Sequence, residues 1–176
     1  GELVPSMIRA GPPVSWLVSR ACPLDLTFVA TSGHEYENHG GAVFLRSALV
    51  PGPDVTALWV HLGAALAARD WHEAEGRLAP LPSVDPQRFL VARPQLVAPL
   101  RTAFAGQPGL EAVYGDEAGA GGELGEILAA GYPRAFGILG AHRFHHSQND
   151  DMRCLDAAHV VSTGRGLLSG VQALLA

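Results

Sequence analysis

Apolar residues occur in short runs along the chain, and the spacing within each run predicts the element that it forms. Near-continuous runs that end in small residues are typical of strands buried in a sheet. By this criterion we expect strands at 24–30, 55–62, 88–92, within "GLEAVYG", and at 134–139. The stretch "WHEAEGR", from Trp71 to Arg77, is more polar and predicts a solvated helix face or a loop.

Apolar residues at helical spacing, bounded by Pro and Gly, predict helices between these strands. The predicted helices cover "VSWLVSRA", 41–50, a segment beginning near Pro94, 123–130, and a long C-terminal stretch that is frayed or bent near 164–166. Strands that alternate with helices indicate an α/β fold, with a mixed, mostly parallel sheet sandwiched by helices. The length predicts one domain over 1–176.

Composition and charge narrow the classes of function. A hydrophobic content of 48% with 16% charged residues indicates a globular chain. The formal net charge of -5 argues against a nucleic-acid partner, because phosphate binding needs a basic face. No apolar run approaches the roughly 20 residues that span a bilayer, and no leader stands at the start. We therefore expect a soluble, cytoplasmic protein without a membrane partner; its basic residues are all arginine, a bias common in GC-rich bacterial genomes.

The segment "TSGHEYENHGG" is the first candidate for chemistry, because it is close to the His-Glu-x-x-His motif of zinc metalloproteases. In that motif the two histidines are four positions apart and project from one helical face. His34 and His39 are five apart, which on a helix turns the second side chain roughly 140° away from the first. The segment is also rich in glycine. We reject the zincin interpretation and do not expect His39 to be a ligand.

A second candidate is "AHRFHHSQNDD", which follows the predicted strand at 134–139. Its histidines and carboxylates can supply metal ligands and the partners that hold those ligands in place. The alternative is a polar surface loop with solvated histidines. His61, near the end of the predicted strand at 55–62, is either a ligand or a hydrogen-bonded core residue. The candidates in the second loop are His142, His145, His146, Asp150 and Asp151.

Three segments, in chain order, resemble the zinc aminopeptidases typified by the bacterial secreted leucine aminopeptidases, whose relatives include the glutaminyl cyclases. "LTFVATSGHEYENHGGAVFL" resembles the family's buried strand that runs into a loop with paired glutamates. "TALWVHLGA" resembles a later strand that ends in an aspartate, and "GELGEILAAGYPRAFGILGAHRFHHSQNDD" resembles the Gly-x-Pro, strand and His-Ser/Thr-x-x-Asp segment near the end. The resemblance implies a three-layer, zinc exopeptidase-like α/β fold and zinc-dependent chemistry on amide or peptide bonds.

The same resemblance implies roles by position. Glu35 and His146 match zinc ligands, and His61 stands where the family has a carboxylate ligand. His34 replaces the glutamate that acts as general base, and histidine can accept a proton near neutral pH. The residues expected to support these ligands from outside are Asp150 and His145.

The chain also departs from the family pattern. The family has a histidine and a bridging aspartate upstream, and "GELVPSMIRAGPPVSWLVSRA" contains neither, so at most one zinc ion is expected. These losses predict an N-terminally incomplete, degenerate aminopeptidase-like domain, a pseudoenzyme that serves as a binding module or as a subunit of a homo- or hetero-oligomer. The alternative is a single-zinc hydrolase or acyl-transfer enzyme. In both cases the expected ligand is a small amide or peptide, and whether the chain is an enzyme stays open.

Overall fold

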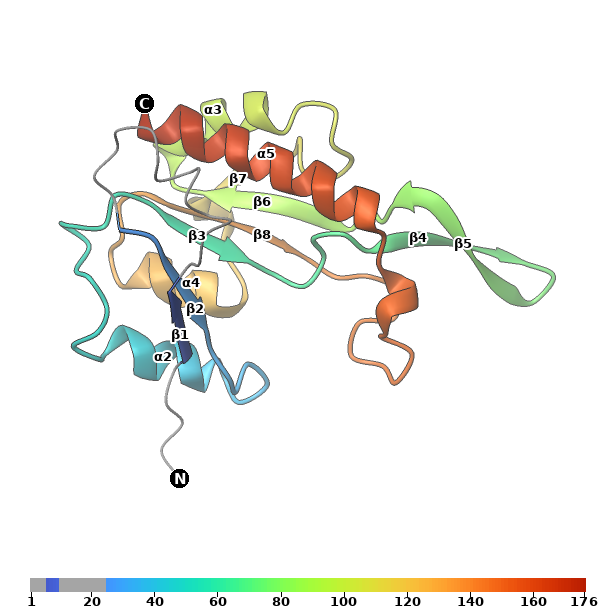
Figure 1. Cartoon of the computed structure of the whole chain (residues 1–176), viewed down its shortest axis with the longest axis horizontal. Coiled ribbons are helices and arrows are strands. Elements are labelled where there is room, and N and C mark those ends of the chain that lie inside the picture. Colours follow the sequence, from blue (N-terminus) through green and yellow to red (C-terminus); the bar gives the residue numbers. More distant parts are fainter. Residues whose placement is uncertain (1–5, 10–24) are drawn as a thin grey trace.

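A four-stranded sheet with the order β3-β8-β6-β7 lies at the centre of the molecule (Figure 1). The computed structural model describes residues 6–9 and 25–176, so the predicted helix "VSWLVSRA" lies outside the described residues. Strands β3 and β8 pair in parallel, as do β6 and β7, whereas β6 and β8 pair antiparallel. The predicted α/β class with a mixed, mostly parallel sheet is therefore confirmed. The strands are β3 Trp59–Leu62, β6 Arg88–Ala92, β7 Val113–Gly115 and β8 Ala135–Gly140.

Helices cover both faces of this sheet (Figure 1). One face carries α3, Val97–Ala103, which follows the short 3-10 turn Pro94–Leu96, and the long C-terminal helix α5, Ala157–Leu175. The other face carries α2, His39–Leu45, and α4, Gly122–Ala129. Helix α2 is shorter than predicted, since it ends well before Pro51.

Helix α5 is continuous through its glycines, so the predicted fraying near 164–166 is wrong. The glycines have a packing role instead. A Cβ atom at Gly166 would lie 2.8 Å from ring atoms of Phe104, and one at Gly170 would lie 3.2 Å from Leu100. Glycine at these positions lets α5 approach α3 closely. The packing between the two helices then offsets the low helix propensity of glycine.

The main hydrophobic core lies between the sheet and the pair α3 and α5. It contains Leu90, Ala92, Leu96, Leu100, Phe104, Leu110, Val113, Phe136, Ile138 and Leu174. A smaller cluster on the opposite face contains Ile127, Tyr132 and Ala135, against which the partly buried Trp59 packs. Within the described residues, the α3 and α5 face therefore buries more apolar side chains than the α2 and α4 face.

The first predicted strand is not a buried member of the main sheet. Strand β2, Thr27–Ala30, pairs antiparallel with β1, Ser6–Arg9, in a separate two-stranded sheet, and most of its side chains are exposed. An apolar run indicates extended structure but does not say which sheet the strand joins or how deeply it is buried. The next strand in the chain is also shorter than predicted, since β3 starts at Trp59 and not at Val55.

The segment "WHEAEGR" forms part of a β-hairpin, so the predicted helix face or loop is wrong. Strands β4, Arg69–Ala74, and β5, Arg77–Val84, pair antiparallel and extend away from the main sheet (Figure 1). Glu75 and Gly76 connect them with φ angles of 52° and 72°. Two positive φ angles in a two-residue loop are typical of a type I′ hairpin turn. Gly76 is the sequence signal for this turn, and the polar residues around it obscure the strands.

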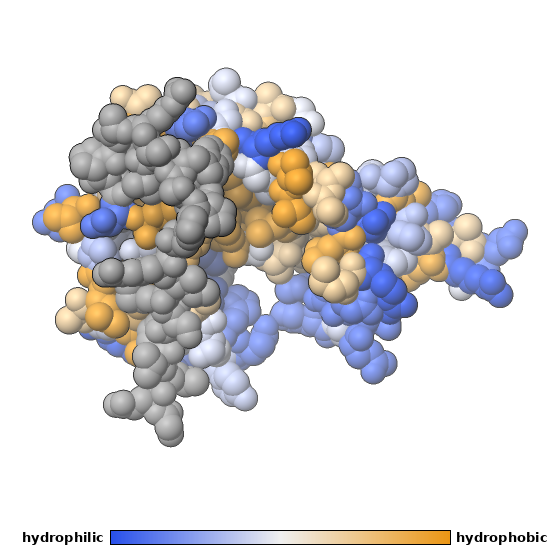
Figure 2. Space-filling model, viewed as in Figure 1, coloured by the Kyte–Doolittle hydropathy of each residue, from blue (hydrophilic) through white to orange (hydrophobic). Residues whose placement is uncertain are grey.

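The surface over the hairpin tip and the loop after β8 is mostly hydrophilic, as Figure 2 shows. None of the helices in the described part of the chain is both long enough and apolar enough to cross a membrane.

Candidate metal centre

The loop between β2 and α2 folds back on the start of the helix and thereby fixes His34 and Glu35. The amide of Asn38 donates to the carbonyl of His34 at 3.0 Å, and the amide of Gly40 donates to the carbonyl of Ser32 at 3.0 Å. A Cβ atom at residue 40 would lie 2.1 Å from that Ser32 oxygen, so only glycine allows this approach. The glycines that argue against a zincin helix are therefore part of a strand-to-helix turn.

The loop between β8 and α5 brings its polar side chains together through successive tight turns. The amide of His145 donates to the carbonyl of His142 at 2.9 Å, and the amide of Asp150 donates to the carbonyl of Ser147 at 3.0 Å. His146 has a φ angle of 61°. This left-handed conformation costs a non-glycine residue roughly 1–2 kcal/mol, and such strain is often found at functional sites.

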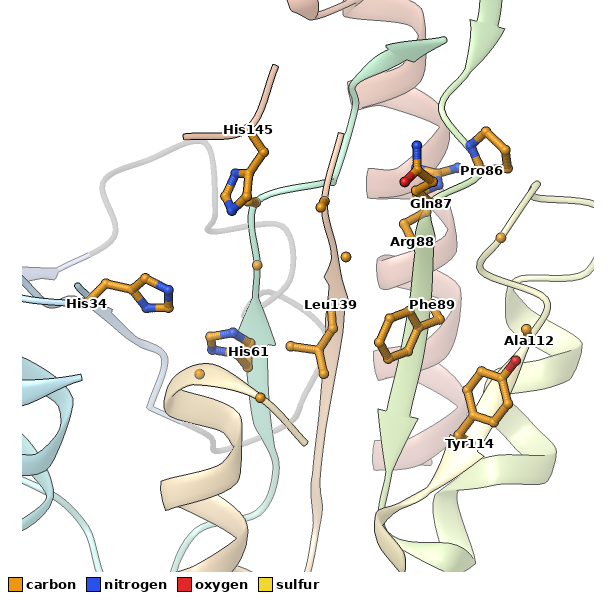
Figure 3. Close-up of a pocket in the computed structure, with 17 residues that line it drawn as sticks. His34, His61, Pro86, Gln87, Arg88, Phe89, Ala112, Tyr114, Leu139 and His145 are labelled. Atoms are coloured by element: carbon orange, nitrogen blue, oxygen red, sulfur yellow. The ribbon is translucent and has the colours of Figure 1, made fainter. Parts of the chain in front are cut away.

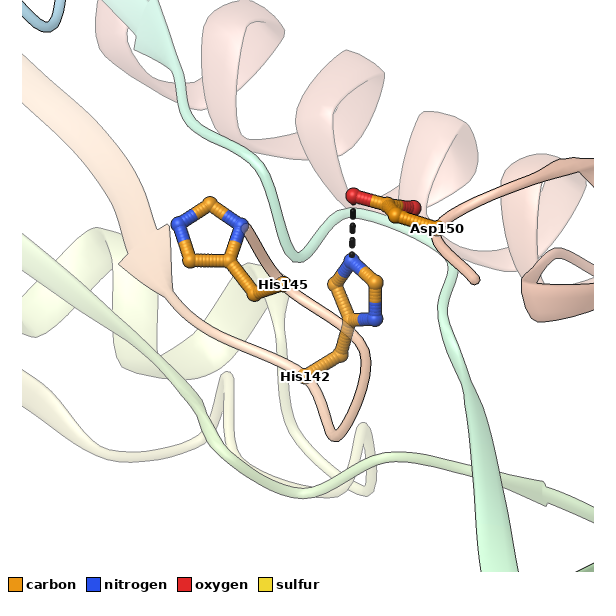
Figure 4. A group of neighbouring side chains, drawn as sticks. All are labelled: His142, His145 and Asp150. Carbon is orange, nitrogen blue, oxygen red and sulfur yellow. Dashed lines mark ion pairs between the residues drawn. The ribbon is translucent and has the colours of Figure 1, made fainter. Parts of the chain in front are cut away.

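His142, His145 and Asp150 each offer a ligand atom, and these atoms all lie within 4.8 Å of one another (Figure 4). His142 is 8% exposed, and its Nε2 lies 3.4 Å from Oδ2 of Asp150. That separation is long for a hydrogen bond. It matches the spacing of about 3.4 Å between two ligands that each lie about 2.1 Å from a tetrahedral zinc ion.

The chemistry of this triad fits zinc. Two imidazoles and a carboxylate are a common ligand set for that ion, and an imidazole must be unprotonated to bind it. The pKa of His145 is lowered, first by burial and then by the neighbouring His146 and His142, while Asp150 and Glu35 oppose the shift. The lowered pKa favours the neutral ring that a metal needs. These residues can therefore hold one metal ion.

The two histidine-rich loops meet, as the resemblance implies, but through a different pairing. His146 Nε2 and Glu35 Oε1 lie 3.0 Å apart, and both side chains are more than half exposed. The His146 ring also lies beside that of His145, with centroids 3.9 Å apart. Between residues 25 and 176, Glu35, His61 and His146 do not form a group whose ligand atoms all lie within 4.8 Å. The structure thus gathers His145 and Asp150, the expected supporting residues, into the metal triad with His142.

A pocket of about 720 Å³ adjoins the triad, and His145, which belongs to the triad, also lines the pocket (Figure 3). His34 and His61 lie on the same side of this pocket as His145. His34 Nδ1 lies 3.0 Å from Oε2 of Glu123, at the start of α4. Gly122, with a φ angle of +60°, precedes Glu123, and a Cβ atom there would lie 3.3 Å from the His34 ring. The absence of a side chain at residue 122 leaves room for the pair.

His61 points from β3 toward α4 and is partly buried. Burial lowers the pKa of His61, with a smaller contribution from His34, while the Glu123 carboxylate opposes the shift. A Cβ atom on the neighbouring residue of β8, Gly137, would lie 2.9 Å from the His61 Cβ. The absence of a side chain at Gly137 therefore leaves room for the side chain of His61.

The other end of the pocket is apolar. Leu139 lies in the middle of the pocket floor, and Phe89 and Tyr114 lie beyond it (Figure 3). The Phe89 and Tyr114 rings pack edge to face with centroids 5.9 Å apart, and both are exposed. The pocket thus combines a histidine-lined side with an apolar, aromatic side.

Sequence reasoning did not assign the roles that two residues have at this site. His142 was among the candidates of the second loop, but the resemblance favoured His146 as the ligand. Glu123 replaces an aspartate of the family pattern, but its pairing with His34 had no local signal, because the two residues are 89 positions apart in the chain. Comparison with known protein families and with curated proteins finds no match for this chain.

Proposed function

We propose that this chain binds one zinc ion through His142, His145 and Asp150 and hydrolyses a small amide or peptide bond in the adjoining pocket. The observation that carries the proposal is the spacing of the triad's ligand atoms beside a pocket that His145 also lines. Three protein ligands leave one position of a tetrahedral site for substrate or water, as in catalytic zinc sites. Zinc in such a site acts as a Lewis acid on a carbonyl group.

His34 is the residue best placed to act as general base. Its Nδ1 contacts Glu123, so the carboxylate orients the ring and Nε2 is the nitrogen that can accept a proton from an attacking water. A histidine oriented by a carboxylate is a recurrent arrangement for proton transfer. The apolar side of the pocket, at Phe89 and Tyr114, offers a contact surface for an apolar part of the substrate.

We also propose that the fold is related to that of the zinc aminopeptidases. Two features support this relationship: a mixed sheet between helices, and two histidine-rich loops that meet through Glu35 and His146. The one-ion triad differs from the two-zinc arrangement of that family.

A specific observation favours a second candidate, a binding module without turnover. Glu35 and His146, the positions that match zinc ligands in the family, pair with each other in this chain. In this second candidate the zinc ion and the pocket hold a small amide or peptide, and the chain works as a subunit of a larger assembly.

The test is the zinc content of untagged protein, measured by elemental analysis for the wild type and for two alanine variants. The proposal expects near-stoichiometric zinc in the wild type and in Glu35→Ala, and its loss in His142→Ala. Zinc lost in Glu35→Ala and kept in His142→Ala would instead support the ligand set that the resemblance implies. Absence of zinc in all three proteins, even after incubation with excess zinc, would exclude the proposal.

A turnover assay distinguishes the two candidate functions, the hydrolase and the binding module. Zinc-loaded wild type is incubated with a panel of aminoacyl and N-acyl arylamides, which release a coloured amine when the amide bond is cleaved. Cleavage that requires both His142 and His34 supports the hydrolase. Saturable binding of an uncleaved amide by the zinc-loaded protein, without release of amine, supports the binding module.

A further inference from the structure

The loop that carries the triad is not held in place by its own turns alone. Its internal hydrogen bonds join residues close in sequence, such as His145 to His142 and Cys154 to Asp151. Such bonds set the local shape of the loop but not its position on the molecule. Contacts with another element must fix the two histidines against Asp150.

The base of the β4–β5 hairpin supplies those contacts. Arg69 donates from Nε to the carbonyl of Leu155 at 3.0 Å, and its Nη2 lies 2.7 Å from Oδ2 of Asp156. These contacts hold the end of the loop where α5 begins. Two residues along β4, the Trp71 ring packs edge-on against Phe144, with centroids 4.9 Å apart. Phe144 lies in the chain between the two histidine ligands.

Trp71 contacts Phe144 by packing and not by a hydrogen bond. The indole Nε1 is buried and has no hydrogen-bond partner within the described residues. A second pocket, of about 390 Å³, lies between the hairpin and the loop and is lined by Trp71, Phe144 and Cys154 among others. The loop is also held by the pair of His146 with Glu35 and by the amide of Ala141, which donates to the carbonyl of Gln87 at 3.0 Å. Beside the open space, the edge contact between the two rings is the one that supports Phe144.

We propose that Trp71 and Arg69 are positioning residues that set the metal affinity of the triad from the base of the hairpin. This inference rests on the metal site of the proposed function. Removal of the Trp71 ring frees Phe144, so His142 and His145 lose their fixed separation from Asp150. Residues that hydrogen-bond to metal ligands without touching the metal typically change affinity by 10–100-fold when substituted, and we expect loss of the packing that holds the ligand loop to act in the same direction.

The experiment measures the zinc dissociation constant of full-length protein by competition with a chromophoric chelator. Trp71→Ala is expected to weaken zinc binding about 10-fold or more, and Arg69→Ala is expected to weaken it in the same direction. Trp71→Phe should restore wild-type affinity, because it keeps an aromatic edge and the lost indole N–H made no hydrogen bond. The matched control is Leu81→Ala, an apolar truncation on the other strand of the same hairpin at a residue that does not line the second pocket, and it should leave the affinity unchanged.

A second readout separates positioning from general destabilisation. Cobalt replaces zinc, and its visible absorption spectrum reports the geometry of the ligands around the metal. Trp71→Ala should change this spectrum in protein that circular dichroism shows to be folded, and Trp71→Phe should not.

The outcomes also distinguish this inference from the proposed function. Wild-type protein that binds neither zinc nor cobalt would overturn both. Wild type that binds zinc, with unchanged affinity and spectrum in both Trp71→Ala and Arg69→Ala, would overturn the positioning role alone.

Discussion

Leu90 and Phe89 are neighbours on β6, yet Leu90 is fully buried and Phe89 is 36% exposed. Leu90 faces α3 and α5, where it joins the main core. Phe89 faces the other side of the sheet, where α4 covers only part of the surface and the pocket begins. The same strand therefore contributes to a packed core on one face and to a candidate binding site on the other.

The two faces differ in polarity as well as in packing. The large, fully buried side chains of the first face are hydrophobic, and its buried Arg88 is satisfied by hydrogen bonds to the carbonyl of Leu66 and to Thr163 Oγ1 on α5. On the second face, His61 lies partly buried beside the pocket, and burial lowers its pKa. A partly buried titratable group with a shifted pKa is a common mark of a functional site. The contrast indicates that the first face mainly stabilises the fold, and it agrees with our proposal that the second face binds a ligand.

The largest expected effect is on the packed face. Phe104 is 0% exposed in the main core, so Phe104→Ala should lower the free energy of unfolding by about 3–5 kcal/mol through lost burial and a cavity. Phe89→Ala is the matched truncation on the open face and should cost only about 1 kcal/mol. Urea denaturation followed by circular dichroism measures both. Equal losses would show that the two faces do not divide these roles.

The next largest effect concerns metal-linked stability on the open side. Free zinc at 100 times the dissociation constant should stabilise the wild type by about 2.7 kcal/mol, because zinc binds the folded state. His142→Ala should lose this gain, whereas His39→Ala, an exposed histidine at the start of α2, should keep it. Urea unfolding with and without zinc measures the difference. A zinc-dependent gain that persists in His142→Ala would contradict the proposed triad.

The packed face could be predicted well from the sequence, because its signals are local. The run "RFLVA" becomes β6 as predicted, and the helix near Pro94 and the long C-terminal helix both form. Apolar spacing directly reports which residues can be buried. Apolar spacing did not predict the hairpin, because its type I′ turn depends on the backbone at Glu75 and Gly76 and the residues that flank the turn are polar.

The candidate site could be predicted only in part, because it depends on contacts between distant segments. The sequence identified both histidine-rich loops, and the structure brings them together at Glu35 and His146. The sequence did not show which of the neighbouring histidines would join His145 and Asp150 as a candidate ligand. That outcome depends on the left-handed backbone at His146 and on the burial of His142, and both arise from the tertiary structure.

A smaller effect is expected from His61 when the pH is lowered. Burial lowers its pKa below the ordinary value of 6.5, so below that pH the unfolded state binds more protons than the folded state does. The free energy of unfolding should therefore fall as the pH drops below about 6.5. In metal-free protein, His61→Leu should make this fall shallower between pH 7 and pH 5. Urea titrations at several pH values test this, and an identical pH dependence in both proteins would contradict it.

The smallest expected effect on stability comes from His34, which is 55% exposed in its pair with Glu123. Exposed ion pairs contribute at most about 1 kcal/mol, so His34→Ala should change the free energy of unfolding by less than that. If His34 is the general base, the same variant should lose about 100-fold or more in amide cleavage while it keeps its zinc. Glu123→Gln keeps a hydrogen-bond acceptor for Nδ1 and should lose less. A His34→Ala protein that cleaves amides at the wild-type rate would remove His34 from the mechanism and leave the open face with a metal site alone.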